Sequence, residues 1–369
     1  MKKLAQILVP GTLSPMSNVQ NVKTNRDEKR WEIEVKAEIT PEALARFRAE
    51  AIKDLGKNIQ VKGFRAGHVP ESEVLRHVGE QEIARRGAEM AIQNSLPELF
   101  ASENLNIVDT PQVSIDTPKD GEALPFTARA PLAPEITLPD YKKLAHEKNE
   151  KKETVTVSDK EYEETLVYLR RERARVEKID AGTEPQQAAE EAQKMDEKDL
   201  PELDDTFVKT LGAEDMKTFS EKLRAQLQNE KEMQEKNKQR AELLDTLVKA
   251  AKISYPAILE EYELDDMEAR LTEDLSKIGR TLEQYLAETK KTRDDVRGEW
   301  KEAADTRVKI RLILGEIART QKKDAPQELV DQEVERAKKQ YPQARPDALR
   351  AHIAHALRNE TVLNWLESL

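Results

Sequence analysis

The sequence predicts an α+β N-terminal domain, a small antiparallel sheet plus a long helical hairpin, joined to an elongated all-α C-terminal domain. Two observations lead to this prediction. Residues 31–39 alternate apolar and polar side chains, which is the period of a strand with one buried face. Residues 40–59 and 70–103, and much of the chain beyond residue 158, repeat apolar side chains every three or four positions, which is the period of amphipathic helices.

The composition favours long, solvated helices. Charged residues make up 36% of the 369 residues and aromatic residues only 4%. A chain of this length is expected to form two or three domains. The net charge of −11 argues against broad nucleic-acid affinity, because neutralising phosphates requires clustered Lys and Arg. The absence of cysteine excludes disulfides, thiolate catalysis and cysteine-type zinc sites.

The N-terminus and the hydropathy predict a soluble protein. Residues 1–4 resemble the charged start of a signal peptide, but Pro10 and Gly11 interrupt the apolar run that follows. No stretch approaches the roughly 18 apolar residues that a membrane span requires. We therefore expect a cytoplasmic protein with no membrane partner.

Four extended segments are expected in the first domain, which we assign to residues 1–133. Asn25-Arg26-Asp27 marks a turn between the first two, so these should form a hairpin. The last two follow the helical part, which gives the order strand-strand-helix-helix-strand-strand of an α+β domain. The four segments are residues 19–22, 31–39, 106–115 and 123–130.

Two helices are predicted between these strands. Thr40 and Pro41 have the residue types of an N-cap and a first helical position. The second helix should begin at Pro70 and run to about Glu103, with a kink or a break at Pro97. Together the helices form a hairpin.

The loop that joins these helices, Val61–Pro70, is called the hairpin loop below. Gly63 and Gly67 permit backbone angles that other residues avoid. Phe64 and Arg65 lie between the glycines, where a turn needs neither side chain, so the loop tip is predicted to be a contact surface. The alternative is that Phe64 folds back between its own two helices.

A local positive patch lies beside the hairpin loop. Lys53, Lys57, Lys62 and Arg65 are accompanied only by Asp54 between positions 53 and 68. Such a patch is suited to phosphate groups of RNA.

The remaining chain is predicted to be a linker followed by helices. Residues 134–157 form the linker, and Ser158 with Glu161 has the pattern of a capping box that opens the helical domain 158–369. Residues 180–199 are rich in Ala, Glu and Gln, so they are expected to be a short linker or a mobile helix.

No catalytic motif is present in the sequence. We find no phosphate-binding glycine loop, no His-Glu-x-x-His and no Gly-x-Ser-x-Gly. His352 and His355 share a helix face, but they lack a third ligand, so a solvated surface is favoured over a metal site. No cofactor and no metal are predicted.

Several motifs resemble the trigger factor family, bacterial chaperones that meet nascent chains at the ribosomal exit. The hairpin loop, Gly63-Phe64-Arg65-x-Gly67-x-x-Pro70, is similar to the ribosome-docking signature of the family. Further similar segments occur in the order of the family and cover most of the chain: Pro134-Glu135-Ile136-x-Leu138, Val157-Ser158-Asp159, Leu169-Arg170, and Leu200-Pro201-Glu202-Leu203 with Phe207 and Leu211-Gly212.

The resemblance implies an ATP-independent chaperone that docks on the large ribosomal subunit beside the exit port and shelters nascent or unfolded polypeptides. It implies a cytoplasmic, ribosome-associated protein whose helical domain forms a substrate cradle. The residues expected to contact the ribosome are Lys57, Lys62, Gly63, Phe64, Arg65, Ala66, Gly67, His68 and Pro70. His68 stands where the family often has lysine, so we expect docking that is weaker or more pH-sensitive than in the family.

Six apolar side chains are candidates for a client-binding surface. For any one of them, packing in a helix–helix core is favoured, because periodic apolar stripes usually face inward. The sequence does not decide which remain exposed. The six are Tyr255, Ile258, Tyr262, Met267, Leu286 and Trp300, and Leu259 and Met233 are further candidates.

A prolyl-isomerase domain is expected at residues 180–199 from the resemblance, but this segment is far too short for an independent domain. We therefore predict that the domain is missing, assign no catalytic residue, and favour a protein that is not an enzyme. Two alternatives stay open: an isomerase with an unrecognised site, and a ribosome-independent holdase or assembly chaperone. Whether the chain forms a homodimer away from the ribosome is also open.

Overall fold

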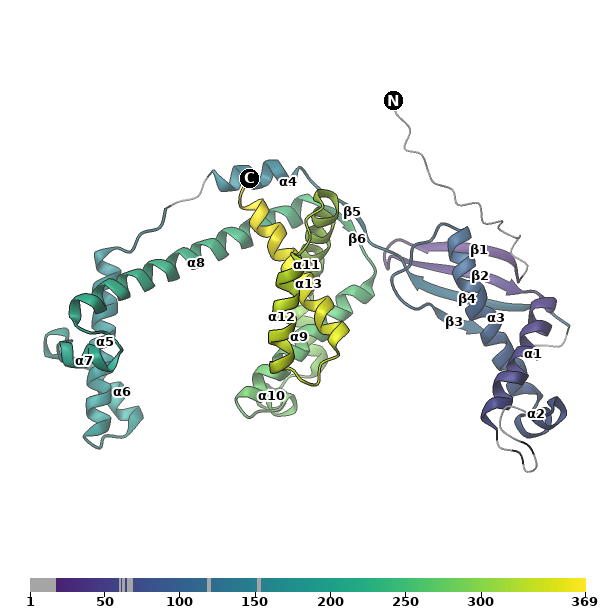
Figure 1. The fold of residues 1–369 in the computed structure, drawn as a ribbon, viewed down its shortest axis with the longest axis horizontal. Coiled ribbons are helices and arrows are strands. Elements are labelled where there is room, and N and C mark those ends of the chain that lie inside the picture. Colours follow the sequence, from purple (N-terminus) through teal and green to yellow (C-terminus); the bar gives the residue numbers. More distant parts are fainter. Residues whose placement is uncertain (1–17, 60, 62–63, 65–68, 118–120, 151–153) are drawn as a thin grey trace. The chain divides into compact units, whose positions relative to one another are not determined.

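The computed structural model describes residues 18–59, 61, 64, 69–117, 121–150 and 154–369 (Figure 1). The chain divides into two compact units, which are described separately. The first combines Met1–Thr137 with Lys252–Leu312, and the second combines Leu138–Ala251 with Ile313–Leu369. Within the described residues, no helix is both long and apolar enough to span a membrane.

A four-stranded antiparallel sheet lies at the start of the first unit. Its order is β1 (Val19–Asp27), β2 (Glu32–Ile39), β4 (Leu124–Pro131) and β3 (Gln112–Ile115). Side chains alternate along β2, so that Val35 and Ile39 are fully buried while Lys36 faces solvent. This confirms the strand predicted from the alternation.

Helices α1 (Pro41–Asn58) and α3 (Glu80–Ser102) cover the buried face of this sheet (Figure 1). Thr40 caps α1, since its hydroxyl accepts a hydrogen bond from the amide of Ala43 at 3.3 Å. Phe47, Leu99 and Phe126 pack in the core between the helices and the sheet. The predicted α+β architecture of this region is confirmed.

The second helix of the hairpin is interrupted at Gly79, which separates α2 (Glu71–Val78) from α3. The backbone of Gly79 has φ +87°, a conformation that glycine adopts without strain. Pro97 lies inside α3 without breaking it. The predicted kink or break at Pro97 is therefore wrong in position, because buried neighbours such as Leu96 and Leu99 hold α3 continuous.

The first unit also contains a second sheet and a group of helices. β5 (Glu135–Thr137) pairs with β6 (Lys252–Ser254), although more than a hundred residues separate them in the chain. The helices are α9 (Ala257–Lys277), α10 (Leu282–Thr289) and the first part of α11 (Arg293–Gln321). Arg297 of α11 joins α9 by ion pairs with three carboxylates, those of Glu261, Asp265 and Glu268.

Among the described residues, the second unit is helical. It contains α4 (Tyr141–Asn149), α5 (Asp159–Asp180), α6 (Pro185–Lys194), the short 3-10 helix η1 (Glu197–Asp199), α7 (Asp205–Thr210), α8 (Met216–Ala250), the end of α11, α12 (Gln327–Gln340) and α13 (Pro346–Leu366). α8 is 35 residues long, and only Leu243 and Leu247, near its end, are buried. Residues 159–250 are called the arm below.

Two segments predicted as linkers contain regular structure. Residues 134–157 include β5 and α4, and α4 starts where the carboxylate of Asp140 accepts a hydrogen bond from the amide of Lys143 at 3.2 Å. Residues 180–199 include α6, which packs on α5 with Ala188 and Ala192 buried. The capping box predicted at Ser158 and Glu161 is confirmed.

Candidate functional site

The hairpin loop is held at its base by a small core, which we name the tip core. Ile52 of α1, Val74 of α2 and Ile83 of α3 are buried together there. The half-buried side chains packed against them are Leu55, Ile59, Val69, Leu75 and Val78. All three helices of the hairpin thus contribute to fixing the two ends of the loop.

Phe64 has an exposed side chain. Its amide donates a hydrogen bond to the carbonyl of Val61 at 3.0 Å, and Val61 is buried. The Phe64 side chain is 45% exposed. An aromatic ring with this exposure on a loop has the properties of a binding anchor.

Most of the predicted contact residues lie outside the described part of the chain. These are Lys62, Gly63, Arg65, Ala66, Gly67 and His68. Pro70 is described: it is the N-cap of α2 rather than its first residue, and its carbonyl accepts from the amides of Glu73 and Val74 at 3.0 and 3.1 Å.

The positive charge of the basic patch beside the loop is neutralised less than the sequence suggests. Asp54, the carboxylate closest in sequence, is engaged by Arg86 of α3, whose Nη2 lies 2.8 Å from Asp54 Oδ2. Lys53 and Lys57 are exposed on α1, and neither makes an ion pair within the described residues. Two ammonium groups are therefore available to an anionic partner at this end of the hairpin.

Contacts between α1 and the other two helices hold the hairpin together. Arg48 donates two hydrogen bonds of 2.8 Å to the carboxylate of Glu80, at the start of α3, and lies 3.8 Å from Glu71, at the start of α2. A Cβ atom placed on Gly87 would lie 3.1 Å from the Cα and N of Arg48. The two helix backbones are thus as close as a glycine allows.

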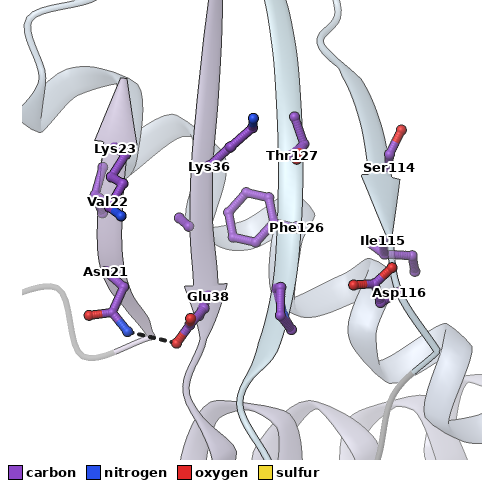
Figure 2. A pocket seen from close by; sticks show the side chains of 12 residues that line it. Asn21, Val22, Lys23, Lys36, Glu38, Ser114, Ile115, Asp116, Phe126 and Thr127 are labelled. Atoms are coloured by element: carbon purple, nitrogen blue, oxygen red, sulfur yellow. Dashed lines mark hydrogen bonds between the residues drawn. The ribbon is translucent and has the colours of Figure 1, made fainter. Parts of the chain in front are cut away.

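The outer face of the sheet is polar and open. A hollow of about 680 Å³ lies on it, and Figure 2 shows Lys23, Lys36, Glu38, Ser114 and Thr127 at its rim. Asn21 donates a hydrogen bond to Glu38 at 2.8 Å. In the described hydrogen bonds, no basic side chain accepts the hydroxyl proton of Ser114 or Thr127.

The six client-binding candidates differ in exposure. Tyr262 is 44% exposed, and its hydroxyl donates to the carboxylate of Asp109, which raises the pKa of the phenol. Tyr255 is half-buried: desolvation, followed by its 2.5 Å hydrogen bond to Asp305, raises its pKa far above the ordinary value. The other four, Ile258, Met267, Leu286 and Trp300, are half-buried. Leu286 and Trp300 also line a small apolar cleft with Leu271, Leu282 and Val296.

Two exposed apolar side chains were not predicted as contact residues. Ile278 is 67% exposed and Tyr168 is 61% exposed. The sequence indicates that both side chains are exposed. Glu164 and Glu172 lie four residues before and after Tyr168, so this helix face is charged. Gly279 follows Ile278 directly and ends the helix there. Met233, a further candidate from the sequence, is 66% exposed and lies on the solvated part of α8.

Among the described residues, no group of His, Asp and Glu side chains is arranged to hold a metal ion. His352 and His355 lie on α13 without a third ligand near them.

Comparison with known proteins gives consistent results for both halves of the chain. The family model described as bacterial trigger factor protein (TF) matches residues 20–169, and the one described as bacterial trigger factor protein (TF) C-terminus matches residues 215–366. The trigger factors of Clostridium tetani, Clostridium beijerinckii and Moorella thermoacetica are 24%, 26% and 25% identical to the chain. These alignments cover 83%, 85% and 90% of this chain and 88% of each relative.

A solved structure from work on promiscuous substrate recognition in folding and assembly activities of the trigger factor chaperone also matches. It has a TM-score of 0.52 and 15% sequence identity, and the match covers 95% of this chain and 99% of the other. At this identity the similarity supports the fold. Because the two family models together match most of the sequence, the chain belongs to the bacterial trigger factor family of chaperones.

Proposed function

We propose that this chaperone docks on the large ribosomal subunit, beside the exit port, through the hairpin loop. The observation that carries the proposal is the exposed ring of Phe64 on a loop whose ends are fixed by the tip core. Lys57 lies in the last turn of α1, next to the loop, and adds a positive charge suited to ribosomal RNA. Phe64 and Arg65 are the main anchors in this proposal.

The arm and the helices α9 to α11 would shelter nascent or unfolded polypeptides. Exposed Tyr168, Met233 and Ile278 offer separate apolar contacts instead of one deep pocket. Contacts of this kind are individually weak and reversible, so a bound segment is released before it folds. The sequence has no nucleotide-binding motif, so we propose that this cycle needs no ATP and takes place in the cytoplasm, on and off the ribosome.

We further propose that the chain lacks a prolyl-isomerase domain. The two matched regions leave only residues 170–214 between them. The alignment to the Clostridium tetani relative runs over 383 residues, more than this chain contains, yet uses 83% of it, so the relative has residues without a counterpart here. A peptidyl-prolyl isomerase assay on a short peptide tests this proposal, and clear turnover would contradict it.

Co-sedimentation with ribosomes tests the docking proposal. Phe64→Ala should weaken binding by about tenfold or more, which is the usual effect of removing an aromatic anchor. Tyr341→Ala is the matched control, because Tyr341 is an aromatic residue with 46% exposure, close to the 45% of Phe64. If both variants and the wild type pellet equally, the hairpin loop is not the anchor and a ribosome-independent holdase becomes the better interpretation.

A further inference from the structure

The part of the arm between the two matched family regions is folded. Helix α5 ends at Asp180, and Gly182 follows at φ +95°. The amides of Gly182 and Thr183 donate to the carbonyls of Ile179 and Lys178 at 2.9 and 3.0 Å, which closes the end of α5. The chain then enters α6 at Pro185, so α5 and α6 form a helical hairpin. Residues 170–204 are named the arm cap below.

Arg171 of α5 closes the end of α6. Its Nη1 donates to the carbonyls of Ala192 at 3.1 Å, of Met195 at 3.2 Å and of Gln193. The last carbonyls of a helix have no partner within the helix, and they form its negative end. One guanidinium therefore supplies both the missing donors and a compensating charge.

Arg170 and Arg173 hold the chain that returns from α6. Arg170 donates to the carbonyls of Leu200 at 2.6 Å and Pro201 at 3.0 Å. Arg173 donates to the carbonyl of Glu202 at 2.5 Å. Residues 201–204 belong to no helix or strand, so their carbonyls lack the backbone hydrogen bonds of secondary structure. The arginine side chains supply hydrogen bonds to these carbonyls instead.

The apolar contacts of the arm cap are small by comparison. Ala174, Ala192 and Leu200 are buried together, with Val167 and Met195 half-buried against them. Two of the three buried side chains are single methyl groups, which remove little apolar area from water. The hydrogen bonds of the three arginines are therefore the main candidates for what holds the cap closed.

We propose that Arg170, Arg171 and Arg173 form a latch that fixes the path of the chain from α6 to α7. All three lie on one turn of α5, and together they bind six carbonyls of residues 192–202. The arm keeps its shape without a further domain between α5 and α7, because the outgoing and the returning chain are held by the same helical turn. At position 170 the latch needs arginine, because Nε and Nη2 of one planar guanidinium donate to the carbonyls of two different residues.

Hydrogen exchange of the full chain, followed by mass spectrometry, tests the latch. In Arg170→Ala/Arg171→Ala, amides of residues 185–203 should exchange at least tenfold faster than in the wild type, while those of Leu243 and Leu247 in α8 stay unchanged. Arg171→Ala alone should accelerate exchange in α6, because all the carbonyls that Arg171 binds belong to residues 192–195. Arg175→Ala is the matched control, since Arg175 lies on the same helix and pairs only with Glu172 at 2.9 Å among the described residues.

Unchanged exchange of residues 185–203 in both latch variants would overturn the proposal, as would equal acceleration in Arg175→Ala. If the double variant exchanges rapidly throughout the chain, the single variant Arg171→Ala decides: selective acceleration in α6 supports the latch, and unchanged exchange there refutes it. A second readout, suppression of aggregation of a chemically unfolded protein, rests on the proposed function. We expect the latch variants to lose this suppression. If the wild-type chain itself suppresses no aggregation, the proposed function is contradicted, but the hydrogen-exchange result still tests the latch.

Discussion

At the start of α5, the carboxylate of Glu161 accepts hydrogen bonds from Lys231 of α8 at 2.7 and 2.8 Å. It also accepts from the backbone amide and the hydroxyl of Ser158, both at 2.8 Å. These contacts, that of Lys231 first, lower the pKa of Glu161 from 4.5 to about 2. The same carboxylate therefore caps one helix and ties it to another.

The lowered pKa predicts a defined pH dependence. The charged form is favoured in the folded state, so the stabilisation is fully present above pH 4.5 and is lost as the pH falls through about 2. Glu161→Gln should remove this part of the acid sensitivity, which circular dichroism of both proteins between these pH values measures. Glu164→Gln is the control, because its 3.4 Å pair with Lys160 is exposed. The prediction fails if the two variants give the same acid transition.

Gly87 gives a second prediction for a single residue. Alanine is normally the better helix former by about 1 kcal/mol. At Gly87, however, the new methyl group would lie 3.1 Å from the backbone of Arg48, which forces α1 and α3 apart. We expect Gly87→Ala to lower the free energy of unfolding by about 1–3 kcal/mol, the usual cost of overpacking.

Gly298 is the matched control for this substitution. It also lies within a helix, α11, but nothing is found within 4 Å of a Cβ atom placed on it. Gly298→Ala should therefore stabilise the protein by up to about 1 kcal/mol. Thermal unfolding of the two variants measures both effects, and shifts of the same sign would contradict the packing argument.

At the scale of elements, α9 and α11 are joined by one central guanidinium. Arg297, only 15% exposed, lies 2.8 Å from Glu261, 2.8 Å from Asp265 and 3.0 Å from Glu268. Arg297→Met should lower the free energy of unfolding by about 1–3 kcal/mol, because charged hydrogen bonds are lost and a half-buried carboxylate loses a partner. Urea unfolding measures the change.

Arg293→Met is the control for the α9–α11 contact. Arg293 also pairs with Glu268, at 2.7 Å, but it is 61% exposed. Exposed ion pairs contribute about 0–1 kcal/mol, so this variant should remain close to the wild type. Equal losses in both variants would show that Arg297 is not the central contact.

Local sequence signals predicted several elements correctly. The alternation in β2, the cap at Thr40 and the capping box at Ser158 all depend on neighbouring residues, and all three are present. The helix break was predicted at Pro97, but it lies at Gly79. The free energy gained by burying the apolar side chains of α3 outweighs the loss of the one hydrogen bond that a proline cannot donate. Gly182 and Pro185 are stop and start signals that indicate a helical hairpin, although composition alone suggested a linker.

Other features depend on contacts between distant parts of the chain. The arginines of α5 look like an ordinary charged helix surface in the sequence, and only the fold brings them to the carbonyls of residues 192–202. The tip core likewise depends on contacts between three helices. The hairpin loop itself was found from its residues, because glycines and an aromatic–arginine pair are a local signal.

At the scale of the whole molecule, the pairing of β5 with β6 makes the first unit discontinuous in sequence. Ile136 is paired with Ile253, so this contact cannot form until the ribosome has synthesised the intervening arm. Contacts of such large sequence separation slow folding, because a long loop must be closed before they form. During its own synthesis this chaperone therefore exposes an incomplete first unit, and the sheet and hairpin of residues 18–131 are the part that can fold before the rest emerges.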